Sequence, residues 1–227
     1  MPSAPPSGSA IPDLTAYPSS GFHPPQQARS RAALQRLLAS AEQVLINEGP
    51  EEFTVARVAE HAGVSVGGVY RRFASKEQLI DAIRNALKER LEEAVSEAVD
   101  KAEPSLGGVL SAFTTALSTV LDESGRVIPA ILAGGRSIDP RQAPQTVTGL
   151  QQQFVDAVAP FHDQIRHPEP VIALNVAFRS VIAAGAHRAA ISPWLPDGLT
   201  WRQWAGEITD MATAYLTAEP RRTSAAT

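Results

Sequence analysis

Apolar residues recur every three or four positions along most of the chain, and no segment alternates as a half-buried strand does. The pattern predicts a first helix over about residues 27–47, ended by Gly49 and Pro50. Thr54 and Ser65 then open two short helices, and Ser75 opens a long one that reaches about residue 99. Ser75 followed three residues later by a Gln is also a capping-box pattern. We therefore expect an all-α fold.

Five further helices are predicted at about residues 105–123, 126–134, 145–160, 169–190 and 200–217, which gives about nine in total. Clusters of Pro, Gly and Asp separate them. The last two helices carry apolar residues at steps of three and four, a spacing typical of helices that pack side by side at a shallow angle. These positions are Val171, Leu174, Phe178, Val181 and Gly185 on one helix, and Trp201, Trp204, Ile208, Met211 and Tyr215 on the other.

Both ends of the chain have the composition of tails. Residues 1–26 are rich in Pro and Ser and hold few apolar residues, so they cannot bury enough surface to offset the entropy of ordering, and we expect them to be disordered. Residues 219–227 are expected to form a second disordered tail. Between the tails we expect two domains, a compact one over residues 27–90 and a larger helical one over residues 91–218.

The segment from Thr54 to Phe73 meets three requirements of a helix-turn-helix. Its helices need a small residue where they cross, which Ala59 supplies. The turn needs a residue that tolerates positive φ, which Gly63 supplies. The second helix needs an apolar plug ten residues after the crossing position, and Val69 stands there. The sequence therefore predicts a motif whose second helix enters the major groove of DNA.

The distribution of charge is compatible with this prediction although the net charge is −4. Residues 27–76 carry seven cations against five acids, whereas residues 77–227 carry 13 cations against 18 acids. A mildly positive N-terminal part thus precedes an acidic body. DNA binding by one end of the molecule fits this asymmetry, which is too small to establish it.

Other functional classes have less support in the sequence. The absence of cysteine excludes disulfides, cysteine-ligated zinc and thiol catalysis, and the five histidines lack metal-ligand spacing. No apolar run approaches the length of a membrane helix. We expect a soluble cytoplasmic protein with no metal, no cofactor and no catalytic site. An enzyme is the alternative of a different class, and a buried carboxylate or histidine with a perturbed pKa, facing a cavity, would indicate it.

The residues around the motif resemble a known family. The run from Ala62 to Ser65, then Val69-Tyr70, Phe73 and the run from Ser75 to Glu77, are similar to the DNA-binding domain of the TetR family of transcriptional regulators. The similarity extends over about residues 31–91. The pair Arg71-Arg72 departs from it, since many members carry a His or a second aromatic residue there. The resemblance implies a homodimeric regulator, most often a repressor that a small molecule releases from its operator.

Nine residues are expected to contact double-stranded DNA. The resemblance places Thr54, Tyr70 and Lys76 on phosphates, and geometry lets Arg71 reach a guanine edge. Arg72 either contacts DNA or pairs with an acid of the long fourth helix. Small residues at the start of the second helix allow a close approach to the bases. The full set is Thr54, Ser65, Val66, Gly67, Gly68, Tyr70, Arg71, Arg72 and Lys76.

The C-terminal region is expected to hold a ligand and a dimer interface. An architectural DNA binder without a ligand is the second alternative, but DNA binding does not need a helical extension of this length. The predicted dimer interface is the set of stepped apolar positions given above. The positions on the last helix could instead line the ligand pocket. Candidate pocket residues are Phe113, Leu117, Ile131, Phe154, Val158, Phe161, Phe178 and Ile182.

Overall fold

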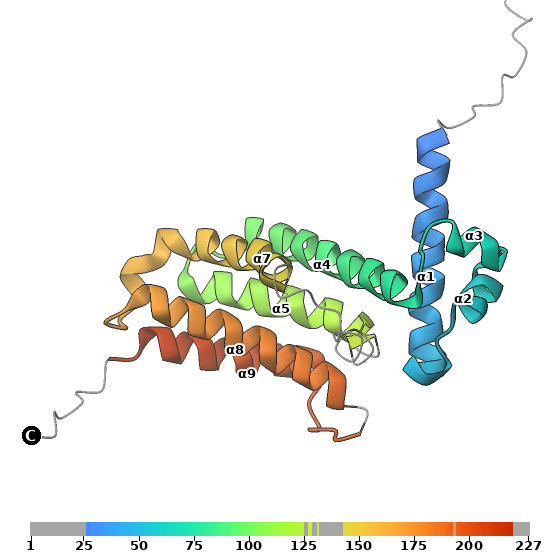
Figure 1. The fold of residues 1–227 in the computed structure, drawn as a ribbon. Coiled ribbons are helices and arrows are strands. Elements are labelled where there is room, and N and C mark those ends of the chain that lie inside the picture. The colour runs from blue at the N-terminus through green and yellow to red at the C-terminus, as the bar shows by residue number, and fades with distance from the viewer. Residues whose placement is uncertain (1–25, 125–126, 129–130, 132–142, 193, 220–227) are drawn as a thin grey trace, which may run out of the picture. The chain divides into compact units, whose positions relative to one another are not determined.

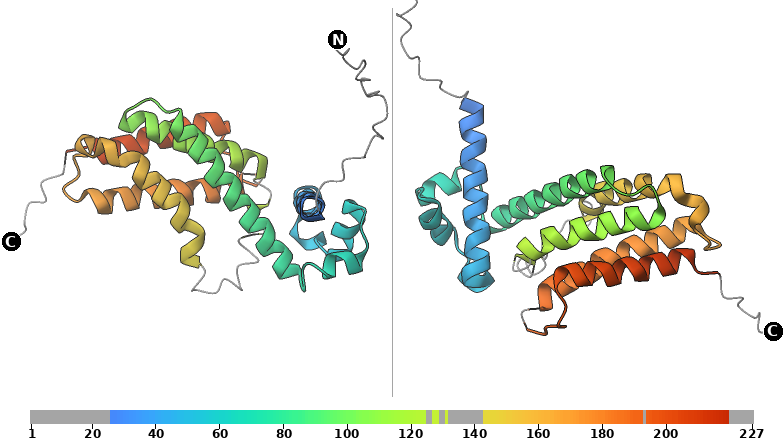
Figure 2. Two further views of the ribbon diagram at one scale, coloured as in Figure 1. Left: turned by 90° about the horizontal axis from the view of Figure 1, so that it is seen from above. Right: turned by 180° about the vertical axis from the view of Figure 1, so that it is seen from behind.

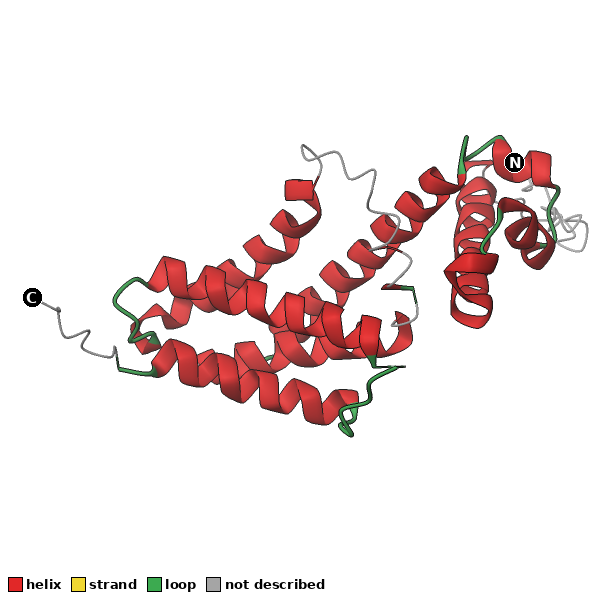
Figure 3. Ribbon diagram, turned by 60° about the horizontal axis from the view of Figure 1, so that its bottom comes forward, coloured by secondary structure: helices red, strands yellow, loops and turns green. Residues whose placement is uncertain are grey.

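The computed structural model describes residues 26–124, 127–128, 131, 143–192 and 194–219. Over these ranges every regular element is a helix and no strand occurs, so the expectation of an all-α fold is confirmed (Figure 3). Contacts divide the chain into two units, residues 1–35 and residues 36–227. The predicted tails lie outside the described residues except for residues 26 and 219, and most of the helix expected at 126–134 lies outside them as well.

The first helix, α1 (Gln26–Glu52), is interrupted where the sequence predicts its end (Figure 1). Gly49 has φ 84° and ψ 172°, a conformation that L side chains rarely adopt, and Pro50 follows it. The regular helix therefore stops before Gly49, and a short turn continues to Glu52. Within the second unit, Leu37, Ala41, Val44 and Leu45 are buried, which confirms the predicted apolar face there.

Three helices follow, each opened by a hydroxyl residue as expected. They are α2 (Val55–Ala62), α3 (Val66–Tyr70) and α4 (Lys76–Asp100). The Ser75 hydroxyl accepts the N–H of Gln78, while the Gln78 side chain accepts the N–H of Ala74 instead of that of Ser75. The capping-box pattern thus forms only one of its two bonds. Because α4 is continuous, the domain boundary expected at residue 90 lies inside a helix.

Helix α5 (Leu106–Ser124) lies at the centre of the C-terminal helices and contacts α4, α7 (Ala143–Val158), α8 (Pro170–Ile191) and α9 (Trp201–Thr217) (Figures 1 and 2). A 3₁₀ segment, η2 (Ala159–Gln164), follows α7, whose end at Val158 lies close to the predicted end at about residue 160. Pro160 explains this ending, because its ring is tolerated only at the start of a helical segment. The Thr200 hydroxyl and Gln203 form a complete capping box at α9, as predicted.

The predicted dimer seam on α8 and α9 needs correction. Phe178, Val181, Gly185 and Trp204 are buried within a single chain. A Cβ on Gly185 would lie 2.8 Å from a methyl of Leu121 and 3.2 Å from the Trp204 ring. The stepped spacing therefore marks the faces that pack on the chain's own core, and these four residues cannot form a surface for a second copy. Leu174, Trp201 and Ile208 are partly buried against the same core, whereas Val171, Met211 and Tyr215 are exposed.

Helix α8 is the one described helix that is long and apolar enough to cross a membrane by length and composition. Ala173, Ala177, Phe178 and Val181 are buried against neighbouring helices. This packing covers one face of α8, and 28% of its most apolar window is buried.

Candidate nucleic-acid interface

Helices α2 and α3 form the predicted helix-turn-helix. Gly63 ends α2 in the left-handed region, with φ 65° and ψ 32°. The N–H of Val64 donates to the carbonyl of Ala59 at 3.0 Å and closes the turn. Ala59 and Val69 are 1% and 0% exposed, respectively, and so fill the space between the helices. All three residue requirements inferred from the sequence are met by these positions.

The outward face of α3 carries most of the residues expected to contact DNA. Ser65, Val66, Gly67, Tyr70, Arg71 and Arg72 are exposed, and Gly68 is half-buried. Tyr70 is 52% exposed, so its ring is not part of the core. The Ser65 hydroxyl accepts the N–H of Gly68 at 3.1 Å and fixes the first turn of the helix. The motif therefore presents one short helix whose exposed N-terminal residues include Ser65 and Gly67, both small.

The two adjacent glycines of α3 have different environments. A Cβ on Gly68 would lie 3.2 Å from the Ser65 hydroxyl and 3.7 Å from the Arg71 guanidinium, so the chain itself restricts this position. A Cβ on Gly67 would meet nothing within 4 Å. Packing within the chain therefore accounts for Gly68 but not for Gly67. A glycine costs about 1 kcal/mol relative to alanine inside a helix, so its presence at 67 requires another reason.

The remaining predicted contacts lie at the ends of helices. The Thr54 side chain is exposed and accepts the N–H of Arg57 at 3.2 Å, which makes it the N-cap of α2. The Lys76 ammonium lies 3.5 Å from the carbonyl of Pro50 and 5.5 Å from the centre of the Phe53 ring. Lys76 thus has partners within the protein besides its expected role toward phosphate.

The charge around α3 is more favourable to DNA than the net charge suggests. Residues 61–76 contain three cations and no acid. The nearest acid before this segment, Glu60, accepts a hydrogen bond of 2.6 Å from Arg57. Arg57 also pairs with Glu48 at 2.8 Å, and its hydrogen bonds hold the pKa of Glu48 below the ordinary value. Arg57 is therefore neutralised by two carboxylates, while Arg71 and Arg72 supply the positive charge of the exposed face.

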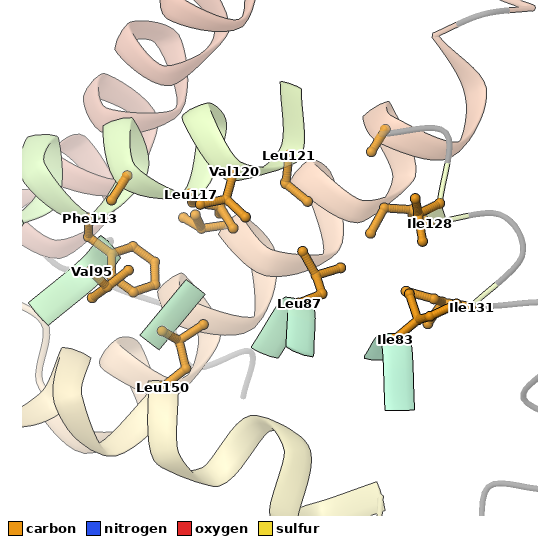
Figure 4. Close-up of a cluster of buried hydrophobic side chains, with 14 of the residues drawn as sticks. Ile83, Leu87, Val95, Phe113, Leu117, Val120, Leu121, Ile128, Ile131 and Leu150 are labelled. Carbon is orange, nitrogen blue, oxygen red and sulfur yellow. The ribbon is translucent and has the colours of Figure 1, made fainter. Parts of the chain in front are cut away.

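Most of the residues proposed for a ligand pocket lie in one buried cluster, part of which Figure 4 shows. The rings of Phe113, Phe154 and Phe178 contact one another with centroids 5.0–5.9 Å apart. Leu117, Ile131 and Val158 are buried as well, whereas Phe161 and Ile182 are only partly buried. The three rings pack edge to face or tilted, so they occupy the space between α5, α7 and α8. The structure thus brings these residues together as core.

Two polar groups that sequence reasoning missed connect elements of the fold. Arg90 of α4 donates to the Glu42 carboxylate of α1 at 3.1 Å and to the Ser124 hydroxyl of α5 at 3.3 Å. Arg188 of α8 is 7% exposed and forms two hydrogen bonds of 3.1 Å with Asp197. Neither partner is recognisable from spacing along the chain, because each belongs to a different element or a loop.

Among the described residues, no three His, Asp or Glu side chains are grouped as ligands for a metal ion. The pKa of Glu42 is raised by burial, and Arg90 opposes this effect. The ion pair of Glu42 with Arg90 connects α1 with α4.

Comparisons with known proteins agree with the motif and the fold. Residues 37–83 match the family model described as bacterial regulatory proteins, tetR family. The TetR family transcriptional regulator PfmR from Thermus thermophilus has 21% identity and a TM-score of 0.60, and the match covers 82% of this chain and 100% of that one. No curated protein matches the chain.

Two further similar structures contain a ligand. FadR from Bacillus subtilis, in complex with stearoyl-CoA, has 11% identity and a TM-score of 0.65, with 80% of this chain and 98% of that one covered. FadR from Thermus thermophilus, a transcriptional repressor in complex with lauroyl-CoA, has 17% identity and a TM-score of 0.56, with 84% and 97% covered. These likenesses show that the chain shares their fold.

An all-α fold with an exposed second helix that carries no acid is the arrangement of a helix-turn-helix DNA-binding regulator. Residues 37–83, the segment from α1 to α4 that contains the motif, match the model of the tetR family of bacterial regulatory proteins.

Proposed function

We propose that this protein is a cytoplasmic repressor that binds a palindromic operator as a homodimer and leaves it when a small molecule binds the C-terminal helices. The observation that carries the proposal is the exposed face of α3, which has cations but no acid between residues 61 and 76. Negative phosphates attract such a surface, and the small residues at its start allow base edges to approach. In a dimer the two recognition helices would enter major grooves about 34–36 Å apart.

The proposed roles on DNA follow from position in the motif. Arg71 presents a guanidinium on the outer face of α3, where a bidentate contact with guanine O6 and N7 is favourable. Tyr70, Lys76 and the N-terminus of α2 at Thr54 are suited to phosphates, which fix the position of the protein without reading sequence. Arg72 has an interaction within the chain, and its role on DNA stays a prediction.

Arg71 provides the test of this assignment. A preferred duplex is first selected from a random pool with the full chain, and Arg71→Ala is then titrated against single-base variants of that duplex. We expect the variant to lose about 1–3 kcal/mol at one base position and to become indifferent to the base there. Arg166→Ala is the matched control, because this arginine is exposed on the loop before α8 and pairs with Glu219. Equal losses for every sequence would place Arg71 on phosphate instead.

The dimer is proposed to form through the outer faces of α8 and α9. Exposed positions of α8 share one stripe, which includes Ile172, Val176 and Ala183 with the basic side chains Arg179 and His187. The exposed stripe of α9 is acidic, with Gly206, Glu207, Asp210, Met211 and Ala214. A two-fold axis would bring α8 of one copy against α9 of the other, so that opposite charges face each other around an apolar centre.

Substitutions on these stripes leave the chain's own core intact, unlike changes at Gly185 or Trp204. Met211→Glu is expected to give a monomer in sedimentation equilibrium and to weaken operator binding, since each half-site would bind separately. Thr119→Glu, at an exposed position of α5, is the control and should remain dimeric. A Met211→Glu protein that still sediments with the mass of a dimer would contradict the proposed interface.

Release by an apolar small molecule is supported by the relatives that bind acyl-CoA. The buried aromatic cluster offers an apolar environment, and a ligand entering it would have to displace the three packed rings. Lauroyl-CoA or stearoyl-CoA is therefore added to the complex of protein and selected duplex, with free CoA as the control. We expect at least a fivefold loss of DNA affinity with the acylated compound alone, within the usual range of allosteric coupling. Unchanged affinity with both acyl-CoAs would contradict an acyl ligand.

A further inference from the structure

Val66, the first residue of α3, is exposed without a reason in the fold. It is 42% exposed, while Val69, three residues further along the same helix, is fully buried. A β-branched residue is also a weaker helix former than the small or straight-chain residues that exposed helix positions tolerate. Val64, which is exposed to a similar extent, differs because its backbone closes the turn on Ala59. The methyl groups of Val66 contribute little to the stability of the isolated protein.

Val66 lies on the face of α3 that carries the proposed base contacts. In a helix, residues four positions apart are neighbours, so Val66 lies beside Tyr70 and Gly67 beside Arg71. All four are exposed. A Cβ at Gly67 would meet open space, so no side chain separates Val66 from a surface that approaches the helix. An apolar group and a guanidinium thus both lie on the exposed side of α3, with Tyr70 and Gly67 between them.

The chemistry of this patch restricts the bases it can recognise. Residues 61–76 contain no Asp or Glu, which would accept from cytosine N4, and no Asn or Gln, which would form the bidentate pair with adenine. The guanidinium of Arg71 suits guanine. The methyl groups of Val66 suit the only apolar feature in the major groove, the C5 methyl of thymine.

We propose that Val66 reads a thymine in the operator by packing its methyl groups against the C5 methyl of that base. The inference rests on the proposed function and adds to it the base that one residue selects. The thymine methyl withdraws about one CH₂ equivalent from water in this contact, near 0.8 kcal/mol. The corresponding loss of affinity when the thymine methyl is absent is about three- to fivefold per half-site.

Deoxyuridine tests this directly, because it differs from thymidine only in lacking the C5 methyl. Each thymine of the duplex selected by the full chain is replaced by uracil, one at a time or, in a palindrome, in symmetric pairs. The affinity of each duplex is then measured for wild type, Val66→Ala and Val64→Ala. We expect one thymine per half-site at which wild type and Val64→Ala lose affinity three- to fivefold. Val66→Ala should bind the thymine and uracil duplexes equally at that position. Thermal unfolding of each variant verifies its fold, and Val66→Thr, which keeps one methyl, should show an intermediate effect.

Three results would overturn the inference. A wild-type affinity that no uracil substitution changes would show that no thymine methyl is read. A methyl effect that persists unchanged in Val66→Ala would assign the contact to another residue. Failure of the full chain to prefer any sequence from the pool would overturn the proposed function together with this inference, whereas the first two results would leave sequence-specific binding intact.

Discussion

At the scale of single residues, the recognition helix combines positions fixed by the fold with positions that the fold leaves free. Val69 is buried against α2, and Gly68 leaves room for the Ser65 cap and the Arg71 guanidinium. Gly67 has open space where a side chain would stand. Since alanine is the better helix former, we propose that the glycine at 67 allows a close approach of DNA to the backbone.

Gly67→Ala should therefore affect stability and binding in opposite directions. We expect the free energy of unfolding to rise by about 0.5–1 kcal/mol, because alanine restricts the unfolded chain and suits the helix. Affinity for the selected duplex should fall about tenfold, as the added methyl keeps the helix from the bases. Gly107→Ala is the control: a Cβ there also meets open space, and DNA affinity should not change. Wild-type affinity in Gly67→Ala would show that the glycine has no role in DNA binding.

At the scale of secondary-structure elements, hydroxyl caps and glycine breaks predicted the boundaries well. Thr54, Ser65, Ser75 and Thr200 all cap the helices that the sequence assigns to them, since capping depends only on residues three positions apart. The partners of an apolar face are harder to predict. Periodicity on α8 and α9 shows that a face is packed but not whether the same chain or a second copy covers it.

Arg188 illustrates a contact that no local pattern reveals. Its guanidinium donates to Asp197 and to the carbonyl of Leu199 at 2.6 Å, and it lies 4.5 Å from the centre of the Trp201 ring. One buried arginine thereby joins the end of α8, the loop and the start of α9. Asp197 is nine residues away, beyond any helical or turn spacing, so the sequence alone could not predict this pair.

Arg188→Ala is expected to lower the free energy of unfolding by about 2–3 kcal/mol, because several hydrogen bonds and a stacked, buried side chain are lost together. Urea denaturation of the full chain measures the change. Arg166→Ala, at an exposed position outside the proposed interface, is the control, and its side chain should contribute within about 0.5 kcal/mol. Similar values for the two variants would mean that the corner between α8 and α9 does not depend on Arg188.

At the scale of the whole molecule, a group of hydrogen-bonded side chains connects the first helix with the C-terminal helices. Arg90 of α4 bonds both Glu42 of α1 and Ser124 of α5. Burial raises the pKa of Glu42, so the ionised carboxylate is less favourable in the folded state than in the unfolded chain. The contribution of Glu42 to stability is thus greatest below its ordinary pKa near 4.5 and is lost as the pH rises through the raised value.

Substitutions in this pair should depend on pH accordingly. Glu42→Gln is expected to be as stable as wild type at pH 7 or slightly more stable, with the difference growing as the pH rises from about 4.5. Arg90→Met should lose about 1–2 kcal/mol at pH 7, because Glu42 keeps its charge without a partner, and less below pH 4.5. The double variant should recover most of this loss at pH 7. Independent, pH-insensitive effects of the two changes would contradict the coupling.

The all-α class and the helix-turn-helix were predictable because they depend on short-range spacing, and the comparisons agree with both. The packed ring cluster of Phe113, Phe154 and Phe178 was predicted as a set of neighbours, but their sequence positions do not show whether they fill a core or surround a ligand. That distinction depends on the volumes of side chains from three helices, which no linear pattern contains.

The most direct test of sequence-specific DNA binding is the ratio of two dissociation constants at physiological salt. The full chain is titrated with its selected duplex and with a scrambled duplex of the same length and composition. A specific regulator predicts at least about 10³-fold tighter binding to the selected duplex. A ratio near one, with both affinities falling alike as salt is raised, would show that the exposed face of α3 binds only phosphate and would contradict the account.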